Sequence, residues 1–226
     1  MALLLRKMRF ALLGLVTMAI VAGAFVWPGI YRSAMTLHDL LTENKQLRQA
    51  IANLTAEDQI GYAKVISQRR EDDRLLTTIR FVETDRNDKA KVILQKEYTI
   101  EGDVVHFDAV IVKFDDKMVS DGTSRAMYLW RRVYGEKMPP DNGYPIEEPG
   151  AEPRRYSGLL EALPIPHRQL FWSSIWELAN DPERLHEYGI RAIYGSAVYQ
   201  PLKEGLIYVF KISPTGQFYP EAVPDM

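Results

Sequence analysis

The sequence predicts an α+β protein in which an N-terminal transmembrane helix and a short coiled-coil helix precede a mainly antiparallel β-sheet or barrel-like head with one or two packed helices. Three observations predict this class. A charge-free apolar run lies near the N-terminus. A heptad pattern of apolar residues follows it. The remainder alternates short runs of β-branched and aromatic residues with turn residues.

The apolar run extends from Phe10 to Trp27, and about 18 residues without a charge are close to the minimum that crosses a bilayer core. Basic residues precede it within residues 1–9, and such flanks stay on the cytoplasmic side. Ala19 and Gly23 form a pair of small residues that lets membrane helices pack closely. The pattern predicts a single-pass protein of the bacterial inner membrane, with residues 1–9 as a cytoplasmic tail, residues 10–27 in the bilayer and the head in the periplasm.

A cleaved signal peptide is the alternative interpretation of the same segment. It too has a basic start and an apolar middle, and Ala22-Gly23-Ala24 resembles a small-residue cleavage site. The length of the apolar run favours a retained anchor.

Residues 30–56 carry apolar side chains at alternating intervals of three and four, which is typical of a coiled coil. So narrow a stripe is buried only against another helix, and it therefore predicts self-association. Asn44 at an inner a position favours a parallel pair in which two asparagines face each other. The alternative is a single amphipathic helix packed on its own head. The predicted a and d residues are Leu37, Leu40, Asn44, Leu47, Ile51 and Leu54.

The head, residues 60–226, contains seven runs that predict strands, mostly joined by hairpin turns such as Glu101-Gly102-Asp103. A tight turn is expected at 115–117, and the tail after residue 213 is expected to be irregular or a short edge segment. Residues 167–179 predict an almost wholly apolar helix. A second helix should follow, with Asp181 as its cap and an end at Gly189. The predicted strands are Ile60–Gln68, Leu75–Glu83, Lys91–Ile100, Val104–Phe114, Ala126–Tyr134, Ile190–Tyr199 and Leu206–Ser213.

Two features of the head are candidates for binding a partner protein. Residues 138–153 contain five prolines and four acidic residues, which excludes a helix or a central strand. This loop either binds a partner or is an ordered excursion over the head. The tryptophans of the apolar helix lie either in a protein interface or in the core. The candidate partner-binding residues are Pro139, Pro140, Tyr144, Pro145, Trp172 and Trp176.

No chemical signature in the sequence indicates catalysis. The chain has no cysteine, no phosphate-binding glycine loop and no hydrolase or metalloprotease motif. His106 and Asp108 share a strand face and are expected to form a structural pair. The paired arginines 131/132 and 154/155 are expected to bind Glu147, Glu148 or Glu152. We therefore expect no catalytic residues, no metal site and no cofactor.

The charge distribution argues against nucleic acid as a partner. The chain has 28 basic residues, three of which precede the apolar run, and 30 acidic residues, none of which does. The part beyond the run is therefore mildly acidic, whereas nucleic-acid binding needs a concentrated basic face.

The first 66 residues resemble the layout of the rod-shape protein family MreC. The resemblance rests on the anchor, on Glu43-Asn44-Lys45-Gln46-Leu47-Arg48 in the heptads and on the strand that contains Ala63-Lys64-Val65-Ile66. It implies a short cytoplasmic start, one membrane helix, a coiled coil and paired β-barrels that serve as an envelope scaffold.

These patterns predict a membrane-anchored scaffold or accessory subunit that dimerises through its coiled coil, contacts the bilayer and other membrane or envelope proteins, and has no catalytic activity. The alternative is a membrane-tethered envelope enzyme or ligand-binding receptor with a site in the head. A third possibility is a subunit that binds an unlike protein through its tryptophans and its proline-rich loop.

Overall fold

The computed structural model describes Gly14, Met18, residues 39–157 and residues 172–225. Most of the predicted membrane span lies outside these residues, as do Ala19, Gly23, Leu37 and the side chain of Trp176. Among the residues that are described, no helix combines the length and the apolar character that a membrane crossing requires. The chain divides into two compact units, Met1–Gln49 and Ala50–Met226.

Residues 39–55 are α-helical. In this helix the predicted a and d side chains Leu40, Leu47 and Ile51 are 57%, 56% and 59% exposed.

The last turn of this helix belongs to the unit Ala50–Met226 and is fixed to the head. Asn53 Nδ2 donates a hydrogen bond to the carbonyl oxygen of Ser120 at 2.8 Å. Leu54 is partly buried against a cluster of core residues. Gly122, at φ +73°, lies so close that a Cβ there would sit 2.9 Å from Asn53 Nδ2. Leu54, predicted as a d residue of the coiled coil, therefore packs within its own chain.

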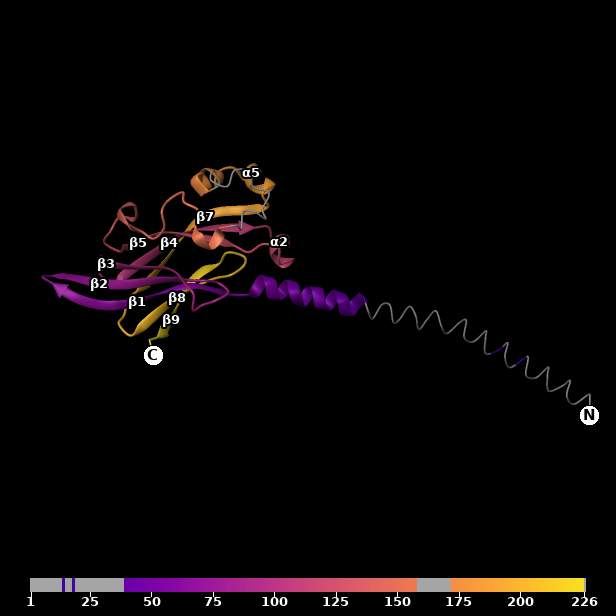
Figure 1. The fold of residues 1–226 in the computed structure, drawn as a ribbon, viewed down its shortest axis with the longest axis horizontal. Helices are drawn as coiled ribbons and strands as arrows, with labels where there is room; N and C mark the ends of the chain where they lie inside the picture. Colours follow the sequence, from indigo (N-terminus) through magenta and orange to yellow (C-terminus); the bar gives the residue numbers. More distant parts are fainter. Residues whose placement is uncertain (1–13, 15–17, 19–38, 158–171, 226) are drawn as a thin grey trace, which may run out of the picture. The chain divides into compact units, whose positions relative to one another are not determined.

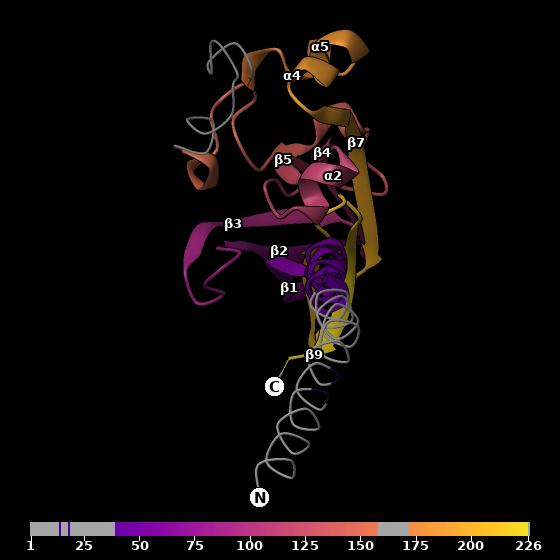
Figure 2. The same cartoon turned by 90° about the vertical axis from the view of Figure 1, so that its right-hand side faces the viewer.

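The unit Ala50–Met226 contains two antiparallel sheets (Figures 1 and 2). The first sheet has the strand order β3-β2-β1-β8-β9. Its strands are β1 Asp58–Glu71, β2 Arg74–Thr84, β3 Val92–Glu101, β8 Leu206–Ile212 and β9 Phe218–Pro224. The second sheet has the order β6-β5-β4-β7. Its strands are β4 Val104–Phe114, β5 Met127–Gly135, β6 Tyr144–Pro145 and β7 Ile190–Pro201.

The fold is α+β, mainly antiparallel and poor in helix, and the described strands form no closed barrel. The barrel-like arrangement expected from the hairpins is therefore wrong. Hairpins join neighbours such as β1 and β2, but the order of each sheet is set by long-range pairs. β1 pairs with β8, and β4 pairs with β7. These pairings produce two separate sheets instead of one closed sheet.

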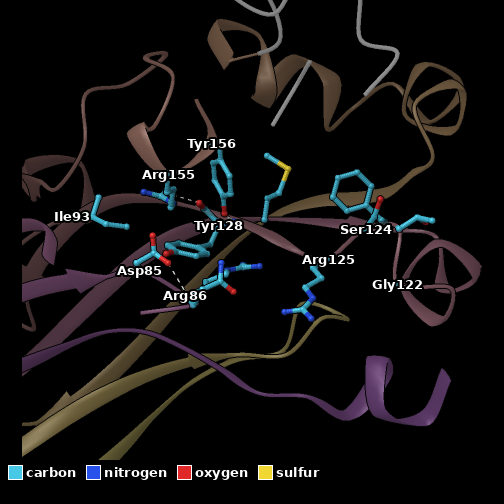
Figure 3. A pocket seen from close by; sticks show the side chains of 13 residues that line it. Asp85, Arg86, Ile93, Gly122, Ser124, Arg125, Tyr128, Arg155 and Tyr156 are labelled. Atoms are coloured by element: carbon cyan, nitrogen blue, oxygen red, sulfur yellow. Dashed lines mark hydrogen bonds between the residues drawn. The ribbon is translucent and has the colours of Figure 1, made fainter. Parts of the chain in front are cut away.

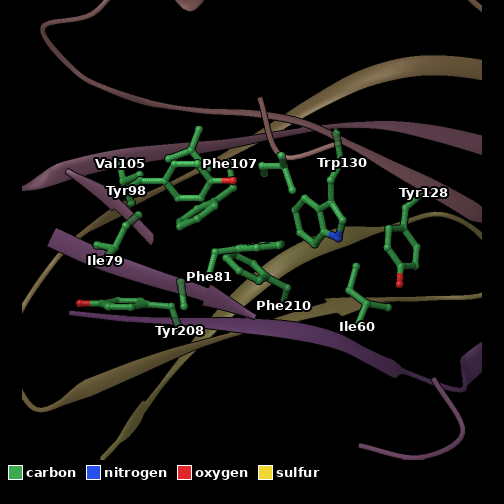
Figure 4. Packing of buried hydrophobic residues seen from close by; sticks show 14 of the residues in the cluster. Ile60, Ile79, Phe81, Tyr98, Val105, Phe107, Tyr128, Trp130, Tyr208 and Phe210 are labelled. Atoms are coloured by element: carbon green, nitrogen blue, oxygen red, sulfur yellow. The ribbon is translucent and has the colours of Figure 1, made fainter. Parts of the chain in front are cut away.

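Aromatic side chains fill the space between the two sheets (Figure 4). The Phe81 ring meets Trp130 edge-on, with ring centroids 4.9 Å apart, and Phe107 meets Phe210 in the same way at 4.6 Å. Edge-to-face contacts of this kind stabilise a core beyond the effect of the area that they bury. This first core holds the head together.

From Ala109 to Val112, strand β4 is apolar on both faces because it separates two cores. Successive side chains of a strand point to opposite faces. Phe107 and Ile111 accordingly enter the first core, whereas Val110 and Val112 enter a second core. Helices cover this second face (Figure 2). They are α2 Asp116–Ser120, α4 Ile175–Leu178 and α5 Pro182–Glu187, with two 3-10 turns elsewhere, η1 Pro140–Asn142 and η2 Arg154–Tyr156.

The predicted cap of the short second helix is confirmed. The Asp181 side chain accepts a hydrogen bond from the backbone N–H of Arg184 at 3.1 Å, and Pro182 is the first helical residue. Gly189 follows the helix at φ +64°, a conformation that favours glycine. The turn expected at 115–117 is wrong, because residues 116–120 form helix α2, which buries Val119.

Candidate functional site

The structure does not gather the candidate partner-binding residues into one surface. Pro139, Pro140, Tyr144 and Pro145 are exposed. The Tyr144 ring stacks on Tyr98 with centroids 6.1 Å apart, and the Pro145 carbonyl oxygen accepts a hydrogen bond from the Tyr98 hydroxyl at 3.3 Å. The proline-rich loop is thus attached to β3, in keeping with an ordered excursion over the head.

Trp172 lies in the second core and is only 2% exposed. Its ring stacks on Tyr156 with centroids 5.8 Å apart and an angle of 11° between the planes. Of the two interpretations that the sequence left open for this residue, the structure places it in the core. A large aromatic ring with this degree of burial does not present its face to a partner protein.

The arrangement of His106 and Asp108 differs from the expected pair. Asp108 binds Arg131 Nη1 and Arg132 Nε, each at 3.0 Å, whereas the His106 ring stacks on Tyr134 with centroids 4.7 Å apart. The expected partners of Arg131 and Arg132 are therefore wrong. A bulge between Asp108 and Ala109 shifts the register of β4 against β5 beside both arginines.

The most distinctive chemistry of the head is a buried cluster around Arg155, whose side chain is 6% exposed. Its Nη1 lies 2.8 Å from Glu83 Oε1 and 2.6 Å from Glu147 Oε1. Its Nη2 donates to Glu147 Oε2 at 2.9 Å and to the Tyr128 carbonyl oxygen at 2.6 Å. Glu83, which is fully buried, also accepts a hydrogen bond from the Tyr128 hydroxyl at 3.0 Å. The predicted pairing of Arg155 with Glu147 is confirmed.

Side chains of this cluster also form hydrogen bonds with the backbone N–H and C=O groups on the outer edge of β5. Strand β6 pairs with this edge only at Arg132 and Val133. Besides the bond from Arg155 to the Tyr128 carbonyl, Tyr128 N–H donates to the Tyr156 hydroxyl at 2.8 Å. Trp130 N–H donates to Glu147 Oε2 at the same distance. Unpaired backbone groups on an edge strand are costly when buried and attract other strands when exposed. The cluster therefore closes this edge as well as balancing buried charge.

Burial dominates the titration of Glu83. Removal from water raises the pKa of its carboxyl from 4.5 to about 7, against the opposing attraction of Arg155. The negative charge of Glu147 raises it further, while the hydrogen bond from Tyr128 lowers it. Glu83 therefore exchanges its proton near neutral pH although it lies in the interior of the head.

A cavity of about 390 Å³ adjoins the cluster, and its volume is within the range of small-molecule sites (Figure 3). Tyr128 lies at its centre between two guanidinium groups, with Arg155 Cζ 4.3 Å and Arg86 Cζ 5.1 Å from the ring centroid. Arg125 and Ser124 extend the wall on the side of Arg86 (Figure 3). The apolar part of the lining comprises Ile93, Phe114, Met127 and the rings of Tyr128 and Tyr156.

Sequence reasoning paired Arg155 with Glu147 but missed Glu83 and the cavity beside the cluster, although one signal was present for Glu83. The alternation in β2 places Glu83 on the same face as Ile79 and Phe81, which are core residues. A carboxylate on the buried face of a strand requires a buried partner. No comparable signal identifies Arg155, which follows the irregular proline-rich loop.

A scan against models of protein families and searches of curated proteins and of solved structures found no match to this chain.

Proposed function

We propose that this protein is a single-pass, membrane-anchored scaffold or accessory subunit of a membrane or envelope complex. It dimerises through its coiled-coil helix and presents the β-rich head on the periplasmic side of a bacterial inner membrane. It works by binding and positioning other proteins, without catalysis of its own.

The exposed heptad residues are the observation that supports this proposal. Leu40, Leu47 and Ile51 are each more than half exposed. Ile51 belongs to the same unit as the head and stays exposed, although Asn53 and Leu54 nearby contact that unit. Apolar side chains at a and d positions are stabilised by knobs-into-holes packing against a second helix. A second copy of this chain supplies such a helix with Asn44 in register, and tethering to one membrane raises the effective concentration of the copies.

Replacing Leu47 with alanine is expected to dissociate the dimer. Leu47 occupies a d position, and loss of a buried leucine costs about 2–5 kcal/mol, which weakens association by more than about tenfold. The measurement is the mass of the full chain in detergent by light scattering over a range of concentrations.

Leu41→Ala is the matched control for this experiment, because Leu41 is 62% exposed and lies at an e position beside the stripe. The Leu41→Ala variant should still have the mass of a dimer. An Leu47→Ala variant with the wild-type mass would contradict the proposal, as would equal effects of the two substitutions.

The proposed topology, with the N-terminus in the cytoplasm, places a reporter fused after Met226 in the periplasm. Only a reporter enzyme that works in the periplasm should therefore be active. The reason is the basic flank of residues 1–9, which keeps the N-terminus in the cytoplasm. The assay compares an enzyme that is active only in the periplasm with one that is active only in the cytoplasm. Activity of the cytoplasmic reporter alone would refute the proposed localisation.

A second candidate function is that of a membrane-tethered receptor for a small ligand. The observation in its favour is the cavity of about 390 Å³ in the head, which combines arginine side chains with apolar walls. Sites for small molecules have this composition, with few polar groups among apolar ones.

A further inference from the structure

We infer that this cavity binds a small molecule that carries one carboxylate on an apolar or aromatic body. The inference rests on the head alone and does not depend on the coiled coil. Its argument has three parts: the charges at one end of the cavity, the arginines that the chain already holds in place, and the apolar character of the remainder.

At one end of the cavity, two arginines share a single carboxylate. Arg86 Nη1 lies 3.7 Å from Asp58 Oδ2, and Arg125 Nη1 lies 3.6 Å from Asp58 Oδ1. These separations fit charge attraction but are too long for good hydrogen bonds. Within this group, two guanidinium groups against one carboxylate leave a surplus of one positive charge, whereas Arg155 on the same cavity faces the two carboxylates of Glu83 and Glu147. Asp85, the acidic residue of the lining, forms an ion pair with Lys91, whose Nζ lies 3.1 Å from Asp85 Oδ2. This end of the cavity therefore favours one additional negative charge.

Two of the arginines that line the cavity, Arg86 and Arg155, are already held in place by the chain. Their Nε atoms are buried without a hydrogen-bond partner, as are Asp58 Oδ2 and Glu83 Oε2. Arg155 is fixed by Glu83, Glu147 and the Tyr128 carbonyl, and Arg86 Nη2 by the Ala126 carbonyl at 2.6 Å. A guanidinium fork that is already held in place binds a carboxylate with little further loss of conformational freedom.

The rest of the lining suits an apolar body. The apolar lining residues are Ile93, which is partly exposed, and Phe114, Met127, Tyr128 and Tyr156, which are almost fully buried. A planar or aliphatic group bound at the arginines would lie along these residues. One surplus positive charge beside an apolar wall fits a monoanionic carboxylate better than a dianionic, fully hydrated phosphate.

The test is a fluorine NMR titration of the full chain in detergent with 4-fluorophenylacetate. The amide of the same acid, 4-fluorophenylacetamide, serves as the neutral match, and detergent alone corrects for partition into micelles. We expect saturable binding of the acid with a Kd of about 1 mM or tighter, and binding of the amide at least about tenfold weaker.

Two variants change this affinity in opposite directions. Arg125→Gln removes a guanidinium group from a side chain that is 49% exposed, so the fold is retained, and it should weaken binding by about tenfold or more. Asp58→Asn removes the carboxylate that competes for both arginines, and it should tighten binding about three- to tenfold. Arg191→Gln is the matched control, since Arg191 is an exposed arginine paired with Asp116 outside the cavity, and it should leave the affinity unchanged.

Several results would overturn the inference. The first is that neither the wild type nor Asp58→Asn binds the acid saturably. The second is that the acid and the amide bind with equal affinity. The third is that Asp58→Asn binds the acid more weakly than the wild type does. Displacement of the fluorinated acid by an equal concentration of inorganic phosphate would overturn the assignment to carboxylates. Failure of the coiled-coil experiments leaves these outcomes unaffected, so the two proposals can be tested separately.

Discussion

Replacing Arg155 with methionine is expected to lower the free energy of unfolding by about 3–5 kcal/mol. The guanidinium group lies between Glu83 and Glu147, and its side chain is almost completely buried. Methionine fills much of the volume but leaves both carboxylates without their cation. It also leaves the Tyr128 carbonyl without its donor. The measurement is chemical denaturation of the full chain in detergent, followed by tryptophan fluorescence.

The neighbouring residue provides the matched control. Arg154 is exposed, and Arg154→Met should change the free energy of unfolding by less than about 0.5 kcal/mol. A double-mutant cycle with Glu83→Gln tests the mechanism, because the cost of Arg155→Met should fall when Glu83 can no longer carry a charge. If Arg155→Met costs no more than Arg154→Met, the buried cluster does not stabilise the head as described.

Glu83 is expected to make the stability of the head decrease as the pH rises from about 4 to about 8. Its pKa is raised from 4.5 to about 7 by burial, so the folded state binds more protons than the unfolded state between these values. The stabilisation by the protonated carboxyl is complete below about pH 4.5 and is lost as the pH passes through about 7. The full change amounts to about 3 kcal/mol, from about 1.4 kcal/mol for each pH unit of the shift.

Glu83→Gln isolates this contribution because it keeps the shape of the side chain and cannot titrate. The difference in the free energy of unfolding between wild type and variant should fall by about 3 kcal/mol from pH 4 to pH 8. Titrating groups that do not interact with Glu83 cancel in that difference. A difference that is flat with pH, or that increases, would show that the pKa of Glu83 is not raised in the folded head.

The strands of the head could be predicted because each is a local pattern with clear limits. Val104–Phe114 has the same bounds in the sequence prediction and in the structure, since Gly102-Asp103 and Asp115 delimit a run rich in β-branched and aromatic residues. Strand β9 was expected only as an irregular or edge segment, because Pro220 and Pro224 reduce its strand character. The structure accepts them at the edge of a sheet. Helix α2 was missed because five residues are too few to show a helical period.

The arrangement of those strands could not be predicted in the same way. Which sheet a strand joins depends on pairs such as β1 with β8, whose residues lie more than a hundred positions apart. The cavity depends on the same distant contacts. Arg86, Arg125 and Arg155 come from three separate connecting segments and meet only after both sheets have formed. Charged residues in connecting segments usually remain in water, so no sequence pattern groups these three arginines.

Oxidative cross-linking of a cysteine at position 44 tests the central claim, self-association through the heptad stripe, most directly. The chain has no cysteine, so one introduced thiol reports alone. In native membranes, Asn44→Cys should form a disulfide-linked dimer, because equivalent a positions face each other in a parallel pair. Gln49→Cys, at the outward f position, should remain monomeric under the same oxidant. Equal cross-linking of both variants, or none of Asn44→Cys, would contradict the account.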